Sequence, residues 1–232
     1  MWRKRSEHHP PFIDRADAGR QLADALAPLV ADMPRERLIA LGLARGGVVL
    51  AAEVSRALGI AMDALVVRKI GAPMQPELAI GAVGPGHNRL LNQPLIASLG
   101  LDRDTVDAIG DTASAERDRL DRELRAGRQP VIHQDHGPVG EGGEGATGAS
   151  MRAAWGYVAR ETAAVIVAVP VAPPDAVNDF ERLGAQVVAL LVVRNFGAVG
   201  SFYTDFGEVR SETVRAILDA EASGPPGMRE SR

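Results

Sequence analysis

Apolar residues follow two alternating patterns along the chain. Short uninterrupted apolar runs have the length of buried strands, and between them apolar residues recur every third or fourth position, as on one face of a helix. The strand-like runs span residues 38–43, 64–69, 77–83, 163–169 and 186–193, and the helical patterns span residues 14–30, 48–58, 105–125 and 175–183. This alternation is typical of consecutive βαβ units. The sequence therefore predicts an α/β protein with an open parallel sheet and helices on both of its faces.

Three segments depart from this regular alternation. Residues 71–76 hold two prolines and a glycine, which favour an irregular loop. The stretch at 105–125 is so rich in charge that we expect a solvated helix rather than a part of the core. Residues 127–148 are rich in glycine, and within them Pro138–Glu141 lacks the β-forming residues of a central strand.

The composition fits one globular domain with short additions. The chain has 232 residues, of which 46% are hydrophobic, and this is enough for a full core. We expect the domain to span residues 12–218, with tails at 1–11 and 219–232.

Charge and cysteine content exclude several classes of protein. Because the chain has no cysteine, it has neither a disulfide scaffold nor a thiol nucleophile. A formal charge of -4 argues against a protein that coats nucleic acid, and no apolar run approaches the roughly 18 residues that span a bilayer. The sequence thus predicts no nucleic-acid or membrane partner, with cytoplasm as the default compartment. The histidines and acids of residues 133–144 lie in a segment without rigid structure, so we expect no dedicated metal site.

Small and basic residues follow the predicted strands, at the edge where open parallel sheets bind ligands. Arg45-Gly46-Gly47 comes after the first strand, and Arg68-Lys69 ends the second. Glycine permits close backbone approach to an anion, and arginine offers a forked donor to phosphate oxygens. Ala146–Ser150 supplies backbone N–H groups and hydroxyls where a helix begins. Together these segments predict a ligand-binding edge of the sheet.

In their order and spacing these segments resemble the type I phosphoribosyltransferases, and more narrowly the bacterial subgroup of predicted phosphoribosyltransferases. The similarity extends from about residue 12 to residue 218 and is carried by Gly42–Gly47, Val67–Lys69, Pro76–Ala82, Ala146–Met151 and Phe202–Phe206. The resemblance implies a central parallel sheet with a small hood, built from the N- and C-terminal segments.

The resemblance also implies an activity. The protein would bind phosphoribosyl pyrophosphate with Mg²⁺, and transfer ribose 5-phosphate to an unspecified nitrogen base. Three cations would stabilise the departing pyrophosphate: Arg45, Arg68 and Lys69. Phosphate and ribose contacts would come from Gly46, Gly47, Glu144, Ala146, Thr147, Gly148, Ala149 and Ser150. Residues 71–76 take the place of the family's mobile loop, and a homodimer is an open alternative to a monomer.

One motif departs from the family pattern. Two adjacent acids normally precede the Ala-Thr-Gly segment, where they hold the ribose hydroxyls and, through water, the metal. Aligned without a gap, these positions are Gly142 and Gly143; a one-residue shift brings Glu144 onto the second acid, and a longer rearrangement recruits Asp135. Two alternatives to a transferase remain open: a catalytically degenerate module that binds a phosphorylated ribose or nucleotide, and a hydrolase, for which no general base is evident.

Each candidate also has a purely structural interpretation. Arg45-Gly46-Gly47 could form a helix-entry turn, and Ala146–Ser150 a linker closed by an ordinary cap. Glu77 could cap a strand instead of contacting the nucleophile. Three polar residues of the first helix are more typical of fixing that helix against the body: Asp14, Arg15 and Arg20. Four late aromatic residues are more typical of core packing than of stacking on a base: Phe196, Phe202, Tyr203 and Phe206.

Overall fold

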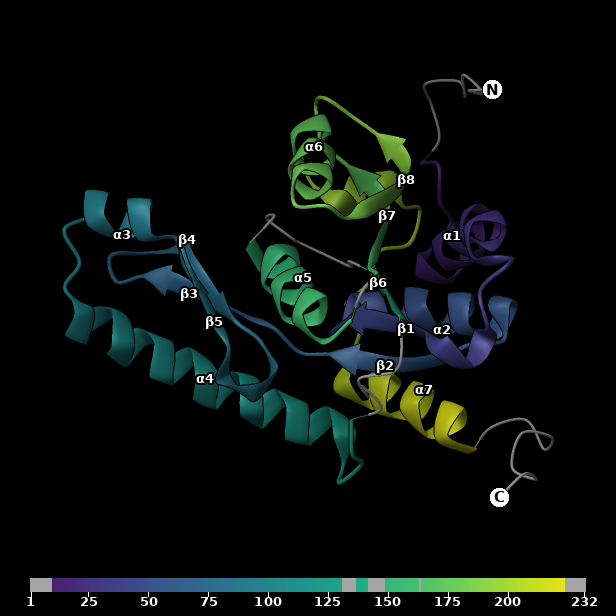
Figure 1. Cartoon of the computed structure of the whole chain (residues 1–232), viewed down its shortest axis with the longest axis horizontal. Coiled ribbons are helices and arrows are strands. Elements are labelled where there is room, and N and C mark those ends of the chain that lie inside the picture. The colour runs from purple at the N-terminus through teal and green to yellow at the C-terminus, as the bar shows by residue number, and fades with distance from the viewer. Residues whose placement is uncertain (1–9, 131–136, 142–148, 163, 224–232) are drawn as a thin grey trace.

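The computed structural model describes residues 10–130, 137–141, 149–162 and 164–223. Strands and helices alternate along the chain, with a separate group of strands after β2 (Figure 1). The strands are β1 Leu38–Leu43, β2 Ala61–Leu65, β3 Arg68–Ala72, β4 Gln75–Val83, β5 Arg89–Leu91, β6 Gly137–Glu141, β7 Ile166–Ala172 and β8 Gln186–Val192. The helices are α1 Arg15–Val30, α2 Gly46–Leu58, α3 Gln93–Ser98, α4 Arg103–Arg125, α5 Ala149–Glu161, α6 Pro174–Arg182 and α7 Ser211–Ser223.

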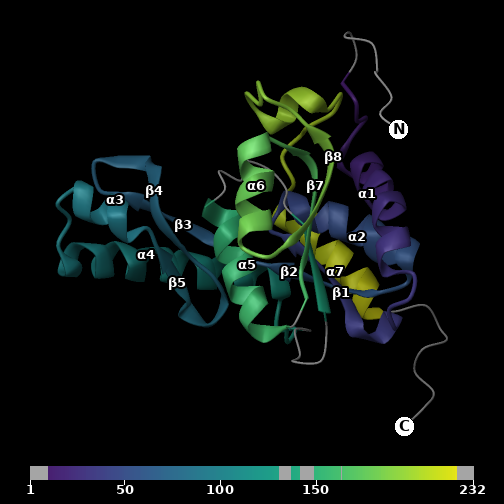
Figure 2. The ribbon, with the colours of Figure 1, turned by 45° about the horizontal axis from the view of Figure 1, so that its top comes forward.

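The central sheet is open and parallel. Its strand order is β2-β1-β6-β7-β8, and each neighbouring pair runs in parallel. Alternate residues of β1 serve opposite faces: Leu38 and Ala40 belong to the core shared with α1, α2 and α7, whereas Ile39 and Leu41 belong to the core shared with α5 and α6. Helices therefore cover both faces of the sheet (Figures 1 and 2), and the predicted fold class is confirmed.

Local signals fix where the helices begin and end. Asp14 caps α1, because its Oδ1 accepts a hydrogen bond from the Asp17 backbone N–H at 2.7 Å. α2 ends at Gly59, whose φ of 65° lies in the left-handed region. α7 extends to Ser223, beyond the domain boundary expected at residue 218. Of the helices in the described ranges, none is both long and apolar enough to cross a membrane.

A second sheet of three antiparallel strands projects from the central one to form an arm (Figure 1). Ile70, Ile80 and residues of α3 and α4 share its core. Two predictions are wrong here. Residues 64–69 do not form one strand, because β2 ends at Leu65 and β3 begins at Arg68. Residues 71–76 are not an irregular loop, because β3 and β4 form a hairpin around residues 73 and 74, with a register shift at Gly71.

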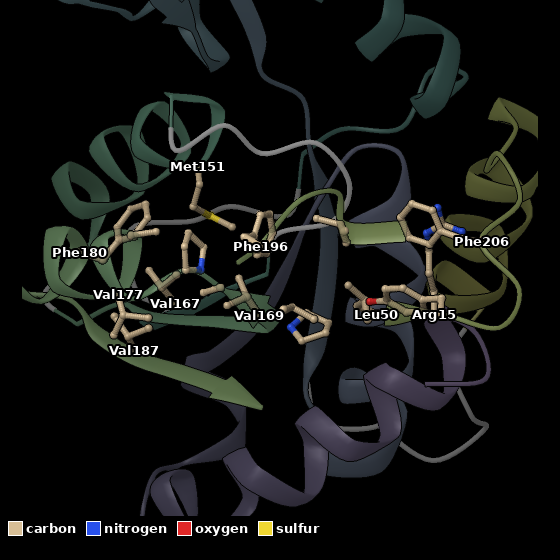
Figure 3. A pocket seen from close by; sticks show the side chains of 17 residues that line it. Arg15, Leu50, Met151, Val167, Val169, Val177, Phe180, Val187, Phe196 and Phe206 are labelled. Carbon is tan, nitrogen blue, oxygen red and sulfur yellow. The ribbon is translucent and has the colours of Figure 1, made fainter. Parts of the chain in front are cut away.

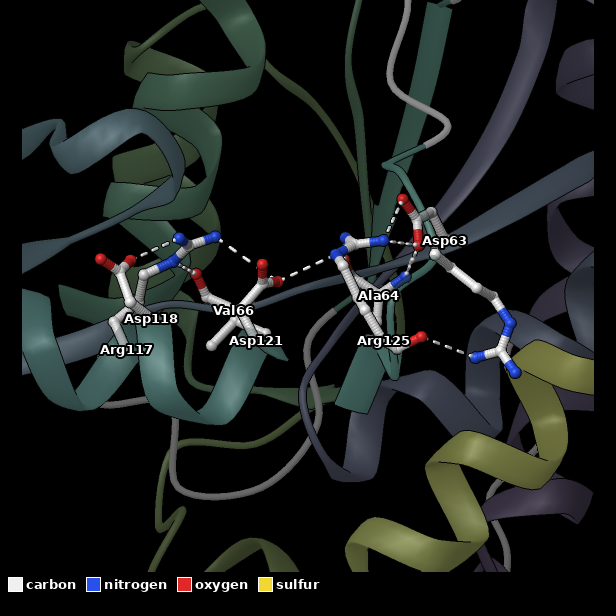
Figure 4. Close-up of polar contacts among 8 residues, drawn as sticks. Asp63, Ala64, Val66, Arg117, Asp118, Asp121 and Arg125 are labelled. Carbon is white, nitrogen blue, oxygen red and sulfur yellow. Dashed lines mark hydrogen bonds and ion pairs between the residues drawn. The ribbon is translucent and has the colours of Figure 1, made fainter. Parts of the chain in front are cut away.

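The charged helix α4 is not a solvated excursion, which corrects a third prediction. Its Arg117 and Arg125 are buried. Arg125 Nη1 lies 2.9 Å from Oδ1 of the buried Asp63 in β2, and its Nη2 donates to the Ala64 carbonyl at 2.8 Å (Figure 4). Burial opposes the charge of Arg125, but the hydrogen bond and charge of Asp63 outweigh this and raise the pKa of Arg125. α4 is thus fastened to the central sheet through its polar side.

The segment Pro138–Glu141 is also a strand, contrary to prediction. It forms most of β6, which lies between β1 and β7 in the middle of the sheet. Parallel pairing with a strand on each side stabilises β6, although its residues have only a weak β-forming tendency.

The two ends of the domain meet in a small hood. Phe12 forms a parallel bridge with Tyr203, in which the Phe12 N–H donates to the Phe202 carbonyl at 3.2 Å. The Thr204 N–H in turn donates to the Phe12 carbonyl at 2.9 Å. The segment before α1 and the segment after β8 are therefore joined, as expected for a hood built from chain ends.

Candidate functional site

The carboxyl ends of β1 and β2 border a cleft of about 510 Å³. The two ends are adjacent because Leu43 pairs with Leu65, and the Ala44 N–H donates to the Leu65 carbonyl at 3.0 Å. The cleft is lined by Leu43, Ala44, Arg45, Gly46, Val67, Arg68, Glu116, Arg119, Leu120 and Glu123. It lies at the edge where open parallel sheets bind ligands.

The turn from β1 into α2 is closely packed. A Cβ atom on Gly42 would lie 2.6 Å from the Gly47 carbonyl oxygen, so no side chain fits there. Gly46 and Gly47 form the first positions of α2, where backbone N–H groups lack a partner within the helix and attract anions. Gly46 lines the cleft, whereas Gly47 is buried. The peptide bond between Ala44 and Arg45, just before these glycines, is cis.

Two of the three predicted catalytic cations line this cleft. Arg45 is the N-cap residue of α2, and Arg68 is the first residue of β3. Arg45 Nη2 lies 2.6 Å from Oε1 of Glu208, and Arg68 Nη2 lies 2.6 Å from Oε2 of Glu116. The fold thus brings together a guanidinium group from the turn after β1 and another from the start of the arm, and each offers a fork that matches phosphate oxygens.

Lys69 is not among the residues that line the cleft. Consecutive residues of a strand face opposite sides, so Lys69 and Arg68 diverge. Lys69 Nζ instead lies 2.9 Å from Oε2 of Glu77, whose side chain is 98% exposed. The two residues therefore pair across the hairpin of β3 and β4.

Three charged residues of the cleft belong to no motif of the sequence: Glu116, Arg119 and Glu123. All three lie on α4, whose charge density made it look like a solvated helix. Their spacing of three and four residues places them on one helical face, and that spacing is the signal that could have found them. Within the described ranges, Arg119 makes no ion pair, so its guanidinium remains available in the cleft wall.

The predicted 5-phosphate cradle leads into α5. Ala149 is the first residue of this helix and Ser150, which is partly buried, is the second. The other predicted residues of this segment lie outside the described part of the chain: Gly142, Gly143, Glu144, Ala146, Thr147 and Gly148.

A small apolar cavity lies between β7, α6 and the hood (Figure 3). Val169, Phe180 and Phe196 contribute to its wall, and Met151 reaches it from the first turn of α5. The late aromatic residues pack together as their structural interpretation expects, with the rings of Tyr203 and Phe206 4.8 Å apart. Phe196, Tyr203 and Phe206 also line the cavity, so packing and contact with a ligand are compatible.

Arg15 brings a positive charge to the wall of this cavity. Its guanidinium lies 3.9 Å from the centre of the Phe206 ring, and its Nη1 donates to the Gly207 carbonyl at 2.8 Å. Burial lowers the pKa of Arg15 and raises the pKa of Tyr203 to about 12. Arg15 therefore fixes the first helix to the hood, as its structural interpretation expects.

The described residues do not form a protein-built magnesium site. In residues 10–130, 137–141, 149–162 and 164–223, no group of three histidine or acidic side chains gathers to hold a metal ion. Mg²⁺ favours carboxylate and phosphate oxygens, but Glu116 in the cleft is already paired with Arg68. We therefore assign no chemical step to a metal held by these residues.

Comparison with known proteins identifies relatives of this chain. Two Mycobacterium tuberculosis proteins, from strains CDC 1551 / Oshkosh and ATCC 25618 / H37Rv, each carry the name "Putative phosphoribosyl transferase" and are 40% identical to the chain over 210 residues. The alignment covers 90% of this chain and 46% of each relative, so the chain spans about half the length of the curated relatives it matches. The crystal structure of TT1426 from Thermus thermophilus is 41% identical, with a TM-score of 0.74, and the match covers 89% of this chain and 97% of that one.

The chain is thus a relative of proteins named as phosphoribosyl transferases, and it shares the fold of TT1426. No family model matches the chain. This similarity confirms the resemblance to phosphoribosyltransferases that the Arg-Gly-Gly turn and its companion motifs carry. The roles of the individual site residues stay predictions.

Proposed function

We propose that the protein binds phosphoribosyl pyrophosphate and transfers ribose 5-phosphate to a nitrogen nucleophile, with release of pyrophosphate. One observation carries the proposal: Arg45 and Arg68 line one cleft at the carboxyl edge of the parallel sheet, next to the N-terminus of α2. Two guanidinium forks and a helix N-terminus suit a diphosphate better than a single phosphate.

In the proposed reaction the bond between ribose C1 and a pyrophosphate oxygen breaks, and its electron pair leaves with pyrophosphate. The lone pair of the acceptor nitrogen forms the new bond to C1, and the proton that this nitrogen loses goes to solvent. Arg45 and Arg68 would donate hydrogen bonds to the leaving oxygens, where negative charge accumulates. The start of α5, at Ala149 and Ser150, would anchor the 5-phosphate and thereby position C1.

The apolar cavity supports the placement of a planar acceptor. Phe196 and Phe206 line the cavity from the hood, and Met151 connects the cavity wall to the helix that begins at the proposed cradle. A planar nitrogen base would therefore find apolar contacts close to the proposed position of C1.

The test is a turnover assay with phosphoribosyl pyrophosphate, Mg²⁺ and a panel of nitrogen bases, in which released pyrophosphate and the new nucleotide are both measured. Arg45→Ala is the inactivating variant, and Arg56→Ala, which alters an exposed pair inside one helix, is the matched control. We expect the wild type and Arg56→Ala to form pyrophosphate and nucleotide in equal amounts. We expect Arg45→Ala to form neither product. Release of pyrophosphate without any nucleotide would instead indicate a hydrolase.

A second candidate function is supported by Gly142 and Gly143, which stand where the family has two acids. A chain without those acids could bind a phosphorylated ribose or nucleotide and catalyse nothing. The variant Gly142→Asp/Gly143→Asp separates the two functions. A transferase activity that appears only in this variant would support the binding module, whereas robust wild-type turnover with no gain in the variant would support the transferase.

A further inference from the structure

Each of the two arginines of the cleft already contacts a carboxylate through one of its guanidinium nitrogens. Arg45 is engaged by Glu208 and Arg68 by Glu116, each through an Nη2 to carboxylate contact of 2.6 Å. In both cases the carboxylate occupies one of the guanidinium nitrogens that a phosphate would use.

The two carboxylates come from parts of the chain outside the phosphate motifs. Glu208 lies in the segment between the hood and α7, and Glu116 lies on α4 and lines the cleft. Each reaches across a long sequence separation to one arginine: 163 residues for Arg45 and 48 for Arg68. Tertiary structure, and not a local sequence pattern, therefore brings one carboxylate into contact with each predicted phosphate-binding arginine.

Both ion pairs are exposed to solvent. The side chains of Glu208 and Glu116 are 72% and 54% exposed, and those of Arg45 and Arg68 are 36% and 46% exposed. Exposed pairs of this kind contribute little stability, so a stronger anion can replace the carboxylate without disturbing the fold. A diphosphate carries more charge than a carboxylate and can bridge two guanidinium groups, whereas each glutamate serves only one.

We propose that Glu208 and Glu116 are internal counter-ions, which hold Arg45 and Arg68 when no ligand is bound and compete with the diphosphate of the ligand for them. This inference rests on the proposed function, because it assumes that the cleft takes a diphosphate. The two glutamates thereby lower the affinity of the cleft for any anion that has to displace them, and most of all for a ligand that takes both arginines.

The opposite role for the glutamates makes the opposite prediction. If Glu208 and Glu116 instead orient the arginines for the ligand, removing a carboxylate leaves the guanidinium group badly positioned and weakens binding. If they compete, removing a carboxylate strengthens binding. The sign of the change in affinity therefore decides between a positioning role and a competing one.

The experiment is a calorimetric titration of the full chain with inorganic pyrophosphate and, separately, with inorganic phosphate. The test variants are Glu116→Gln, Glu208→Gln and the double variant, since glutamine keeps the shape and removes the charge. The controls are Asp107→Asn, which is 54% exposed on the same helix as Glu116, and Glu212→Gln, which is 73% exposed close to Glu208 in sequence. Each control removes the same charge from a side chain that is paired with an arginine outside the cleft.

We expect each test variant to bind pyrophosphate about two- to five-fold more tightly, and the double variant to combine the two gains. The gain should shrink as ionic strength rises. In the double variant the gain should be smaller for phosphate than for pyrophosphate, because a single phosphate displaces only one carboxylate. Unchanged thermal unfolding of all variants shows that the fold is intact.

Weaker pyrophosphate binding in Glu116→Gln and Glu208→Gln would overturn the proposal in favour of a positioning role. Equal tightening in Asp107→Asn and Glu212→Gln would overturn it in favour of a net-charge effect. Failure of the proposed function looks different, because the wild type and every variant would then bind neither pyrophosphate nor phosphoribosyl pyrophosphate.

Discussion

Arg125, in the last turn of α4, and Asp63, in β2, form a buried ion pair with the guanidinium nitrogen 2.9 Å from the carboxylate oxygen. Their side chains are only 9% and 3% exposed. Arg125 also donates to the Ala64 carbonyl and to Asp121 (Figure 4), so both charges are fully engaged. The pair connects α4, which carries Glu116 and Arg119, to β2, which lies beside the strand that leads to Arg45.

Removing one member of this pair should destabilise the fold strongly. Asp63→Ala leaves the charge of Arg125 buried without its partner, and we expect a loss of about 3–5 kcal/mol in the free energy of unfolding. The exposed pair of Glu212 and Arg215 offers the control, because Glu212→Ala should cost about 0–1 kcal/mol. Urea denaturation measures both. Equal costs for the two variants would show that the buried pair does not anchor the arm.

A side chain at Gly42 should disturb the turn that forms the cleft. In Gly42→Ala the new Cβ would meet the Gly47 carbonyl at 2.6 Å, so we expect a loss of about 1–3 kcal/mol in unfolding free energy and weaker anion binding. Gly156 lies inside α5, and no atom lies within 4 Å of the position that a Cβ would take there. Gly156→Ala should therefore be stabilising by about 0.5–1 kcal/mol. A neutral Gly42→Ala would refute the close packing of this turn.

The position of each predicted catalytic cation relative to the cleft predicts how much its removal changes ligand affinity. Arg45→Ala removes a charge-assisted donor worth about 1.5–3 kcal/mol, so phosphoribosyl pyrophosphate should bind at least about tenfold more weakly. Lys69→Ala should change the affinity less than about twofold, because Lys69 pairs with Glu77 away from the cleft. Titration calorimetry checks both variants, and a larger loss for Lys69→Ala would move the site to the hairpin.

Tyr203 should make the stability of the hood sensitive to alkaline pH. Burial raises its pKa to about 12 in the folded protein, whereas an unfolded tyrosine titrates at about 10. Because the folded pKa lies above the unfolded one, this contribution is complete below pH about 10 and is lost as the pH rises toward 12. The chain has two tyrosines, so an ultraviolet titration of wild type and Tyr203→Phe isolates this group. A late transition that persisted unchanged in Tyr203→Phe would count against the burial of this hydroxyl.

The sequence was informative wherever local pattern and fold agree. The strand at 38–43 and the turn at Arg45 appear in the structure where the sequence pattern predicts them. Their determinants lie within a few residues of one another, so a short window contains the whole signal.

Prediction failed where distant partners decide the structure. Gly137–Glu141 has poor β-forming residues, yet β1 and β7 hold it as a central strand. α4 looked solvated because the partner of Arg125, Asp63, lies 62 residues earlier in the chain. The same reason hid Glu116 and Glu208 from the candidate site, since their contacts with Arg68 and Arg45 exist only after folding.

The central claim is that the cleft and the start of α5 together form a site for phosphoribosyl pyrophosphate. The most direct measurement is a calorimetric titration with this compound, with and without Mg²⁺, and with ribose 5-phosphate as the control ligand. We predict Mg²⁺-dependent binding that is clearly tighter than binding of ribose 5-phosphate, because only the full ligand engages Arg45 and Arg68. Equal affinity for the two compounds, indifferent to Mg²⁺, would contradict the account and leave a simple phosphate-binding protein.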